Sequence, residues 1–99
     1  MKLVFDELAK KELFAGTEYY ELEVPGLGQK FQDEIKRVLR IIKEIPEIGS
    51  FESEHIKKYI LHKFPYKILY SIEKDHIYVI AIAHMHREPS FWVERINPN

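Results

Sequence analysis

The sequence predicts a two-layer α+β fold with the element order β-α-α-β-β-β, in which a helical hairpin packs on an antiparallel sheet. Two helical segments occupy the first half of the chain, whereas from residue 54 onward apolar residues recur with the period of two that is typical of strands. The 99 residues have the length of one domain, and a hydrophobic fraction of 45% is enough to fill a core. We therefore expect residues 1–99 to form a single domain.

The helical half follows a short strand that we expect at residues 1–5. Asp6 can cap a first helix over residues 7–23 through its carboxylate. The apolar residues of this helix that we expect to face the core are Leu8, Ala9, Leu13, Phe14, Tyr20 and Leu22. Pro25 and the glycines after it end the helix, because proline lacks a backbone N–H and glycine tolerates a positive φ. A second helix is expected over residues 29–44, with a helical stripe formed by Phe31, Ile35, Val38, Leu39 and Ile42.

Three strands in succession form the second half, as a β-meander. They are expected at residues 55–64, 66–73 and 76–86, with Pro65 interrupting the first pair and a tight turn at residues 74–75. Residues 47–53 are expected to be a loop. A short C-terminal helix is expected within residues 89–96, where Phe91 and Trp92 would hold the segment on the sheet.

Composition excludes several classes of site. The chain has no cysteine, which excludes disulfides, a thiol nucleophile and metal sites built on thiolates. His84 and His86 with His62 have a spacing that could suit zinc, but no supporting motif accompanies them, and we expect neither a metal nor a cofactor. The longest uncharged run, residues 77–86, is too short to cross a membrane. An acid at position 6 disfavours a secretory leader, so we expect a cytoplasmic protein.

Charge is distributed unevenly along the chain, although the net charge is only −1. Residues 1–25 are acidic, whereas residues 55–74 carry five lysines against a single glutamate. A local positive stretch on a near-neutral chain suits one anionic ligand or one acidic partner. The alternative is that these lysines only solvate the outer face of a strand pair.

Several segments together resemble the RelE/ParE superfamily of type II toxins. Residues 64–70, FPYKILY, match its FPY-x-I-x-Y strand, and residues 80–95 match its ending V-x-H-x-x-R-x-P-x-x-W-x-x-R. The first half contributes further elements in the same order, namely Glu12-Leu13, Tyr19-Tyr20-Glu21 and Gly26-Leu27-Gly28 with Phe31 and Glu34. The agreement in order and spacing extends from Leu8 to Arg95.

This resemblance implies a compact toxin that is encoded beside an antitoxin, which wraps and neutralises it. RelE-like members cleave messenger RNA in the ribosomal A site without metal, whereas ParE-like members poison DNA gyrase and lack a ribonuclease site. The motifs here are similar to those of the ParE-like and plasmid-stabilisation group, and the near-neutral charge agrees, since ribosome-bound toxins sit among dense phosphates. We expect a ParE-like toxin that acts on gyrase. The alternatives are a metal-independent endoribonuclease acting on ribosome-bound messenger RNA, and a relative without activity that still binds an antitoxin.

The candidate site residues differ between these hypotheses. A ribonuclease would use His84 or His86 as acid or base, and Arg87, with Lys57 or Lys58, to hold the phosphate. Otherwise the two histidines are structural or contact the antitoxin. The residues that we expect to bind a substrate or partner are Lys57, Lys58, Lys63, Lys67, Trp92 and Arg95. Arg95 is expected to pair with Glu94 or Glu88. Four tyrosines could stack bases, but we favour rings at the helix–sheet boundary with hydrated hydroxyls, at positions Tyr19, Tyr20, Tyr66 and Tyr70.

Overall fold

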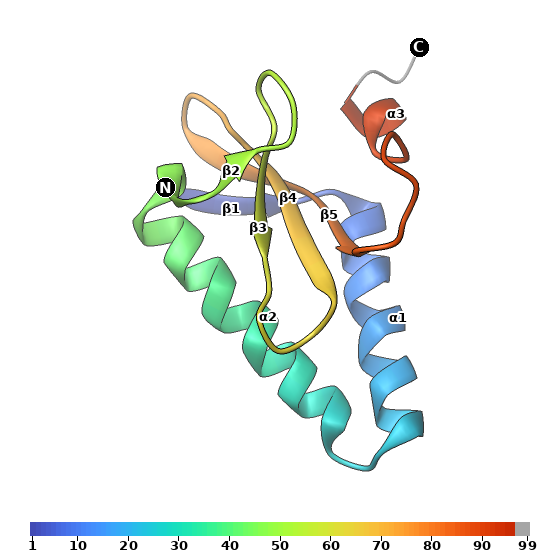
Figure 1. Cartoon of the computed structure of the whole chain (residues 1–99). Coiled ribbons are helices and arrows are strands. Elements are labelled where there is room, and N and C mark those ends of the chain that lie inside the picture. The colour runs from blue at the N-terminus through green and yellow to red at the C-terminus, as the bar shows by residue number, and fades with distance from the viewer. Residues whose placement is uncertain (97–99) are drawn as a thin grey trace.

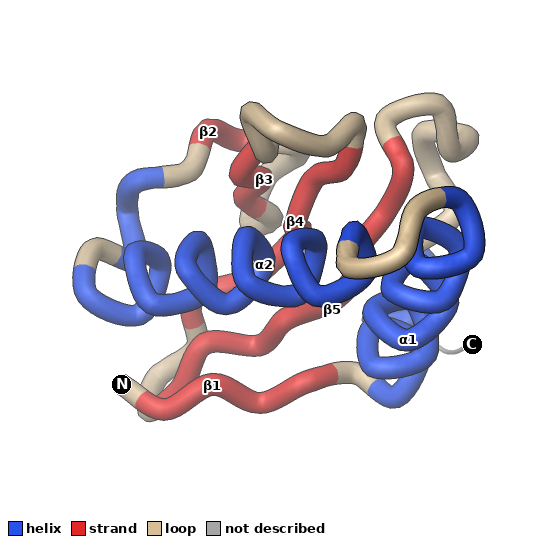
Figure 2. The backbone as a smooth tube through the Cα atoms, turned by 90° about the horizontal axis from the view of Figure 1, so that it is seen from below, coloured by secondary structure: helices blue, strands red, loops and turns tan. Residues whose placement is uncertain are grey.

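The computed structural model describes residues 1–96 and has a helical hairpin on one face of a five-stranded sheet (Figure 1). The elements in chain order are β1 (Lys2–Phe5), α1 (Glu7–Glu23), α2 (Leu27–Glu44), the 3-10 turn η1 (Pro46–Ile48), β2 (Ser50–Phe51), β3 (Lys57–Ile60), β4 (Tyr66–Ile72), β5 (His76–His84) and α3 (Val93–Ile96). Figure 2 shows α2 running across the sheet and α1 lying beside it. The predicted two-layer α+β architecture is confirmed.

The sheet differs from a simple meander at both of its edges. Its strand order is β1-β5-β4-β3-β2, in which β1 pairs in parallel with β5 and the remaining pairs are antiparallel. The short strand β2 lies in the segment that was expected to be a loop. β5 ends at His84, two residues earlier than expected, because Met85 N–H donates to the Pro65 carbonyl and Arg87 N–H donates to the His84 carbonyl, which turns the chain. β3 is confined to Lys57–Ile60, and the C-terminal helix is confined to Val93–Ile96.

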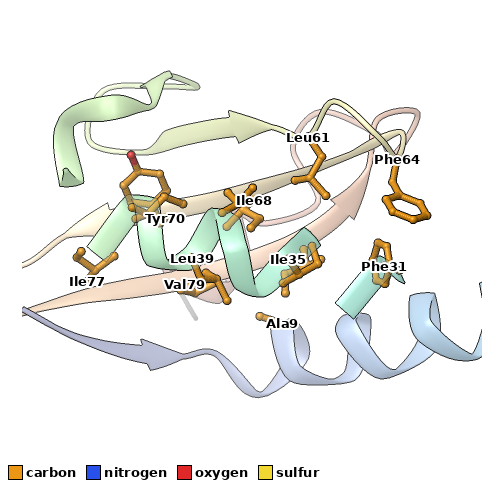
Figure 3. Close-up of a cluster of buried hydrophobic side chains, with 13 residues drawn as sticks. Ala9, Phe31, Ile35, Leu39, Leu61, Phe64, Ile68, Tyr70, Ile77 and Val79 are labelled. Carbon is orange, nitrogen blue, oxygen red and sulfur yellow. The ribbon is translucent and has the colours of Figure 1, made fainter. Parts of the chain in front are cut away.

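The apolar stripe of α2 faces the sheet as its spacing predicts. All five residues of the stripe are buried, and they join residues of β4 and β5 in the main core (Figure 3). Helical periodicity is strong here because charged residues occupy most of the opposite face. Burial of this stripe fixes how the hairpin lies on the sheet.

The apolar residues of α1 are arranged differently from the prediction. Leu8, Phe14 and Leu22 are 46%, 69% and 82% exposed, so their assignment to the core was wrong. The other three predicted residues, Ala9, Leu13 and Tyr20, do join the core, and they share one side of the helix with Gly16. A Cβ at Gly16 would lie 2.8 Å from the Phe31 ring, so this glycine allows the two helices to approach closely. The close contact uses one narrow side of α1 and leaves its other apolar residues in solvent.

The corner of the helical hairpin forms where the sequence predicts it. Gly26 has φ of 90°, a left-handed conformation that favours glycine. The Glu21 carboxylate accepts hydrogen bonds from the backbone N–H groups of Gly26 at 2.9 Å and Gly28 at 3.1 Å. A single side chain therefore caps the start of α2 and holds the end of α1 against it.

A buried tyrosine ties the end of the helical hairpin to the sheet. Tyr70 of β4 is fully buried, and its hydroxyl donates to the Pro46 carbonyl at 2.7 Å and accepts from Gly49 N–H at 3.0 Å. Figure 3 shows its ring on the inner face of the sheet with the oxygen pointing outward from the cluster. The hydrated hydroxyl that was expected at this position is therefore wrong, because η1 covers it.

The second face of the sheet is covered by the C-terminal segment. Trp92 is buried against Leu69, Ile80 and Ala81, and Phe91 packs at the margin of this cluster. The predicted attachment of the segment to the sheet is thus confirmed. Within residues 1–96, no helix is both long and apolar enough to span a bilayer.

We predict that Tyr70→Phe lowers the free energy of unfolding by about 1–3 kcal/mol, because it leaves the buried Gly49 N–H and the partly buried Pro46 carbonyl without their shared partner. Urea unfolding followed by circular dichroism measures the change. Tyr59→Phe, at a half-exposed position of β3, is the matched control and should unfold almost as the parent does. Equal stability of the two variants would contradict this role for the Tyr70 hydroxyl.

Candidate functional site

The two candidate histidines lie at the end of β5, on the exposed surface. His84 is the last residue of the strand, and His86 follows in the turn, with the two ring centroids 5.2 Å apart. His86 N–H donates to Nδ1 of His84 at 3.1 Å, and the Tyr66 ring lies against His84 with centroids 5.5 Å apart. The predicted proximity of the pair is present, although a turn rather than a shared strand face produces it. Because Nδ1 accepts this bond, the neutral His84 ring carries its proton on Nε2.

A carboxylate from α1 forms the centre of the polar cluster beside these histidines. Oε1 of Glu12 accepts hydrogen bonds from Ile82 N–H at 3.0 Å and from Arg95 Nη1 at 2.9 Å. Oε2 accepts from Arg95 Nη2 at 2.8 Å and from Arg87 Nη1 at 3.2 Å. With four donors around it, this carboxylate has its accepting positions filled.

Side chains of this cluster form hydrogen bonds with backbone groups of β5 that no neighbouring strand pairs. β1 reaches only to Phe5, opposite Val79, so the end of β5 has no neighbouring strand on that side. Glu12 accepts from Ile82 N–H there, and Arg95 donates to the Ile80 carbonyl at 2.9 Å. Side chains from α1 and the C-terminal segment thus replace a strand, since a buried backbone group needs a partner.

Arg95 lies inside the protein, and its expected pairing with Glu94 or Glu88 is wrong. Its side chain is 6% exposed and binds Glu12, which is 83 positions away in the sequence. Hydrogen bonding to Glu12 is also the main cause that raises the pKa of the Arg95 guanidinium above its ordinary value. Sequence reasoning singled out Arg95 as a partner-binding residue and named Glu12 only as part of the resemblance; it did not pair the two, because no local spacing relates them.

Arg87 is the exposed cation of this cluster. Its side chain is 46% exposed, and its guanidinium carbon lies 4.3 Å from the centroid of the Phe91 ring. The hydrogen bond to Glu12 places a negative charge directly beside it. Arg87 thus follows directly after His86 in the sequence, and its positive charge is paired with the carboxylate of Glu12.

The lysines of the strand pair are also held by internal partners. Lys57 is buried, and its Nζ donates to the Gly49 carbonyl at 2.9 Å, lies 3.4 Å from Glu47 and sits 4.0 Å from the Phe51 ring centroid. Lys58 and Lys67 both approach Glu52, with N–O distances of 3.6 and 3.5 Å. Three of the five lysines in the positive stretch thus pair with two carboxylates of the preceding segment. A role of these lysines in partner binding remains a prediction.

The remaining predicted lysine, Lys63, lies in the turn between β3 and β4, at the border of a groove beside α2. This groove, about 730 Å³ in volume, separates the turn from α2. On α2, Glu34 is buried although it is charged, and Arg37 binds its carboxylate through two hydrogen bonds of 3.0 and 2.9 Å. Sequence reasoning did not identify this groove, because its two sides come together only in the fold.

Histidine, aspartate and glutamate side chains do not gather into a metal-binding group of three or more anywhere in residues 1–96. His62 lies in the β3–β4 turn, whereas His84 and His86 lie at the end of β5. The β5 end brings together two imidazoles, the Tyr66 ring and an arginine that binds Glu12.

We predict that Glu12→Ala lowers the free energy of unfolding by about 3 kcal/mol, because it leaves the buried Arg95 guanidinium without its counter-ion and Ile82 N–H without an acceptor. Chemical denaturation of the purified variant measures the change. Glu7→Ala is the control, since Glu7 pairs with Lys10 on the exposed side of the same helix. Similar losses for the two variants would argue against a special role of Glu12.

The pairing of Glu34 with Arg37 predicts a loss of folding stability at acid pH. Hydrogen bonding to Arg37 lowers the pKa of Glu34 below its ordinary value of 4.5, so folding favours the charged carboxylate. This stabilisation is complete above the ordinary pKa and is lost as the pH falls through the lower pKa of the folded state. We expect Glu34→Gln to be less stable than the parent at neutral pH and to lose less further stability below about pH 5. Melting temperatures measured across this pH range, with Glu44→Gln as control, test the prediction; parallel curves would refute it.

Several solved structures have a fold similar to that of this chain. In the solved structure described as the chromosomal ParDE toxin–antitoxin system from P. aeruginosa, a chain matches with a TM-score of 0.76 and 17% identity, over 85% of this chain and 95% of that one. A mutant of the E. coli toxin RelE in the free state matches with a TM-score of 0.71 and 24% identity, over 96% of each chain. The isolated E. coli RelE toxin matches with a TM-score of 0.66 and 22% identity, over 98% of this chain and 96% of that one. At these identities the structures establish a shared fold.

Family membership rests on the sequence itself. No curated protein matches the chain significantly. The family model described as the ParE toxin of the type II toxin–antitoxin system, parDE, matches residues 3–89, from β1 through the turn after β5. Since this match covers most of the chain and agrees with the fold, the protein belongs to the ParE toxin family of type II toxin–antitoxin systems.

Proposed function

We propose that this toxin arrests growth by binding a protein target, DNA gyrase, in the bacterial cytoplasm, and that a cognate antitoxin neutralises it. Membership in the ParE family implies a toxin with an antitoxin partner. The single observation that most favours a binding mechanism over RNA cleavage is the state of Glu12, whose carboxylate is fully used by internal donors.

RNA cleavage through the ribose 2′-hydroxyl needs a base, an acid and a cation that stabilises the charged phosphate. At the β5 end both arginines already bind the Glu12 carboxylate, and Arg95 is also buried. The lysines that could have assisted, Lys57 and Lys58, lie in ion pairs with Glu47 and Glu52. The site therefore offers imidazoles but little free positive charge for a phosphate.

The endoribonuclease hypothesis keeps one observation in its favour. His84 and His86 are both exposed, with their rings adjacent and Arg87 next in the chain. Two imidazoles could act as base and acid, and the outer side of Arg87 faces solvent. A direct comparison of gyrase inhibition with transcript cleavage separates the two functions.

The deciding experiment measures both activities of the purified, antitoxin-free chain. We expect it to block ATP-dependent supercoiling of relaxed plasmid by gyrase, or to trap gyrase on cleaved DNA. In cells that express the toxin, transcripts should stay intact while the DNA-damage response and filamentation appear. Normal supercoiling together with transcripts cut within codons would overturn the proposal in favour of ribonuclease activity.

Histidine variants give an independent prediction. We expect the double substitution His84→Ala with His86→Ala to leave growth inhibition as strong as in the parent, whereas loss of general acid–base catalysis would reduce cleavage by about 10²–10⁴-fold. The control removes two other exposed histidines, through His55→Ala with His62→Ala. Loss of growth inhibition in the first variant alone, with folding and antitoxin binding retained, would support the enzyme instead.

A further inference from the structure

The outer face of α2 carries a block of positive charge. Residues 35–43, IKRVLRIIK, contain four cations and no acidic residue. The apolar residues of this segment are buried or partly covered, so the cations occupy the solvent side of the helix. Figure 2 shows α2 lying in front of the strands, so that its outer side faces the viewer.

Three of these cations form one line along the helix, which we call the basic stripe. Lys36, Arg40 and Lys43 follow the i, i+4, i+7 spacing of neighbours on one helical face, and all three are exposed. Within residues 1–96, none of them belongs to an ion pair. The fourth cation, Arg37, binds the buried carboxylate of Glu34 beside the stripe. The basic stripe therefore presents three free charges on one helix.

The basic stripe differs from the positive regions at the β5 end and in the strand pair. There, the nearest cations already bind carboxylates of the protein itself. At the stripe, Asp33 and Glu44 lie at the two ends of the line of cations and form no ion pair with them in the described part of the chain. An anion that binds to the stripe therefore displaces no internal partner.

The chemistry of this face fits the phosphates of a nucleic acid backbone. No apolar residue of α2 is exposed, so the face has no anchor for a peptide side chain or for insertion among lipid chains. Lys36 and Lys43 are about 10 Å apart along the helix axis, a length over which a DNA duplex carries about six phosphate charges. A line of three cations can therefore contact several phosphates of a duplex at once.

We propose that the basic stripe binds the phosphate backbone of duplex DNA without regard to sequence. The choice of DNA rests on the proposed function, because gyrase acts on duplex DNA and a toxin bound to gyrase lies close to that duplex. Contacts to phosphates position a protein on DNA without reading its bases. The stripe thus gives the toxin a higher affinity for gyrase that holds DNA than for gyrase alone.

The test measures binding of the full chain, without gyrase or antitoxin, to a short fluorescein-labelled DNA duplex by fluorescence anisotropy. Three phosphate contacts predict a slope of about −2.7 when the logarithm of the association constant is plotted against the logarithm of the salt concentration. The paired substitution Lys36→Gln with Arg40→Gln should weaken binding at low salt by about tenfold or more and make the slope shallower by about two. Lys11→Gln with Lys74→Gln is the matched control, because it removes two exposed lysines from α1 and from the β4–β5 turn. This control should bind DNA as the parent does.

Three outcomes would overturn the inference: no saturable binding of the duplex at low salt, equal losses for the two variant pairs, or equal affinity for a glutamate-rich peptide. Equal affinity for single-stranded RNA of the same length would overturn the assignment to DNA. With gyrase present, the Lys36→Gln, Arg40→Gln variant should bind DNA-free gyrase as the parent does and bind the gyrase–DNA complex more weakly. Gyrase inhibition without DNA binding by the chain would contradict the role of the stripe alone. DNA binding without gyrase inhibition would support the stripe and contradict the proposed function, so the two failures are distinguishable.

Discussion

The carboxylate of Glu12 holds together three parts of the chain, namely α1, β5 and the C-terminal segment. β5 extends beyond its partner β1, which leaves backbone groups of the most buried strand exposed along one edge. Glu12 accepts hydrogen bonds from Ile82 N–H on this edge and from Arg95, and Arg95 also donates to the Ile80 carbonyl on the same edge. Both α1 and the C-terminal segment are therefore fixed to β5. Arg95 in turn helps to hold the segment that carries Trp92 over the second face of the sheet. Because the pair is largely buried, neither member can be removed without leaving the other unsatisfied.

The same arrangement restricts what the surface can do. Histidines and arginines at the end of a strand could support phosphate chemistry if the arginines were free to bind the phosphate. Here Glu12 shares its charge with both arginines, and the strand-pair lysines lie beside glutamates of the preceding segment. The cations nearest to the β5 end and to the strand pair thus already bind carboxylates of the protein itself. This favours a toxin that recognises a protein surface over one that must stabilise a charged phosphate.

Two surfaces remain that differ in character. The β5 end presents imidazoles and an arginine at an exposed turn, whereas the outer face of α2 carries the basic stripe of Lys36, Arg40 and Lys43. They lie on different elements, so a partner at one need not block the other by direct contact.

The sequence alone determined the features that depend on local spacing. The apolar stripe of α2 and the glycine corner follow from residues close together in the chain and formed as predicted. The three expected strand segments contain β3, β4 and β5, although β3 and β5 are shorter than expected. Tertiary structure decided the rest. Periodicity could not reveal that Leu8, Phe14 and Leu22 face solvent, because the close approach at Gly16 lets α1 contact the core along one narrow side. Nor could spacing pair Glu12 with Arg95, since these residues are brought together only when the first helix and the last segment meet at an open sheet edge.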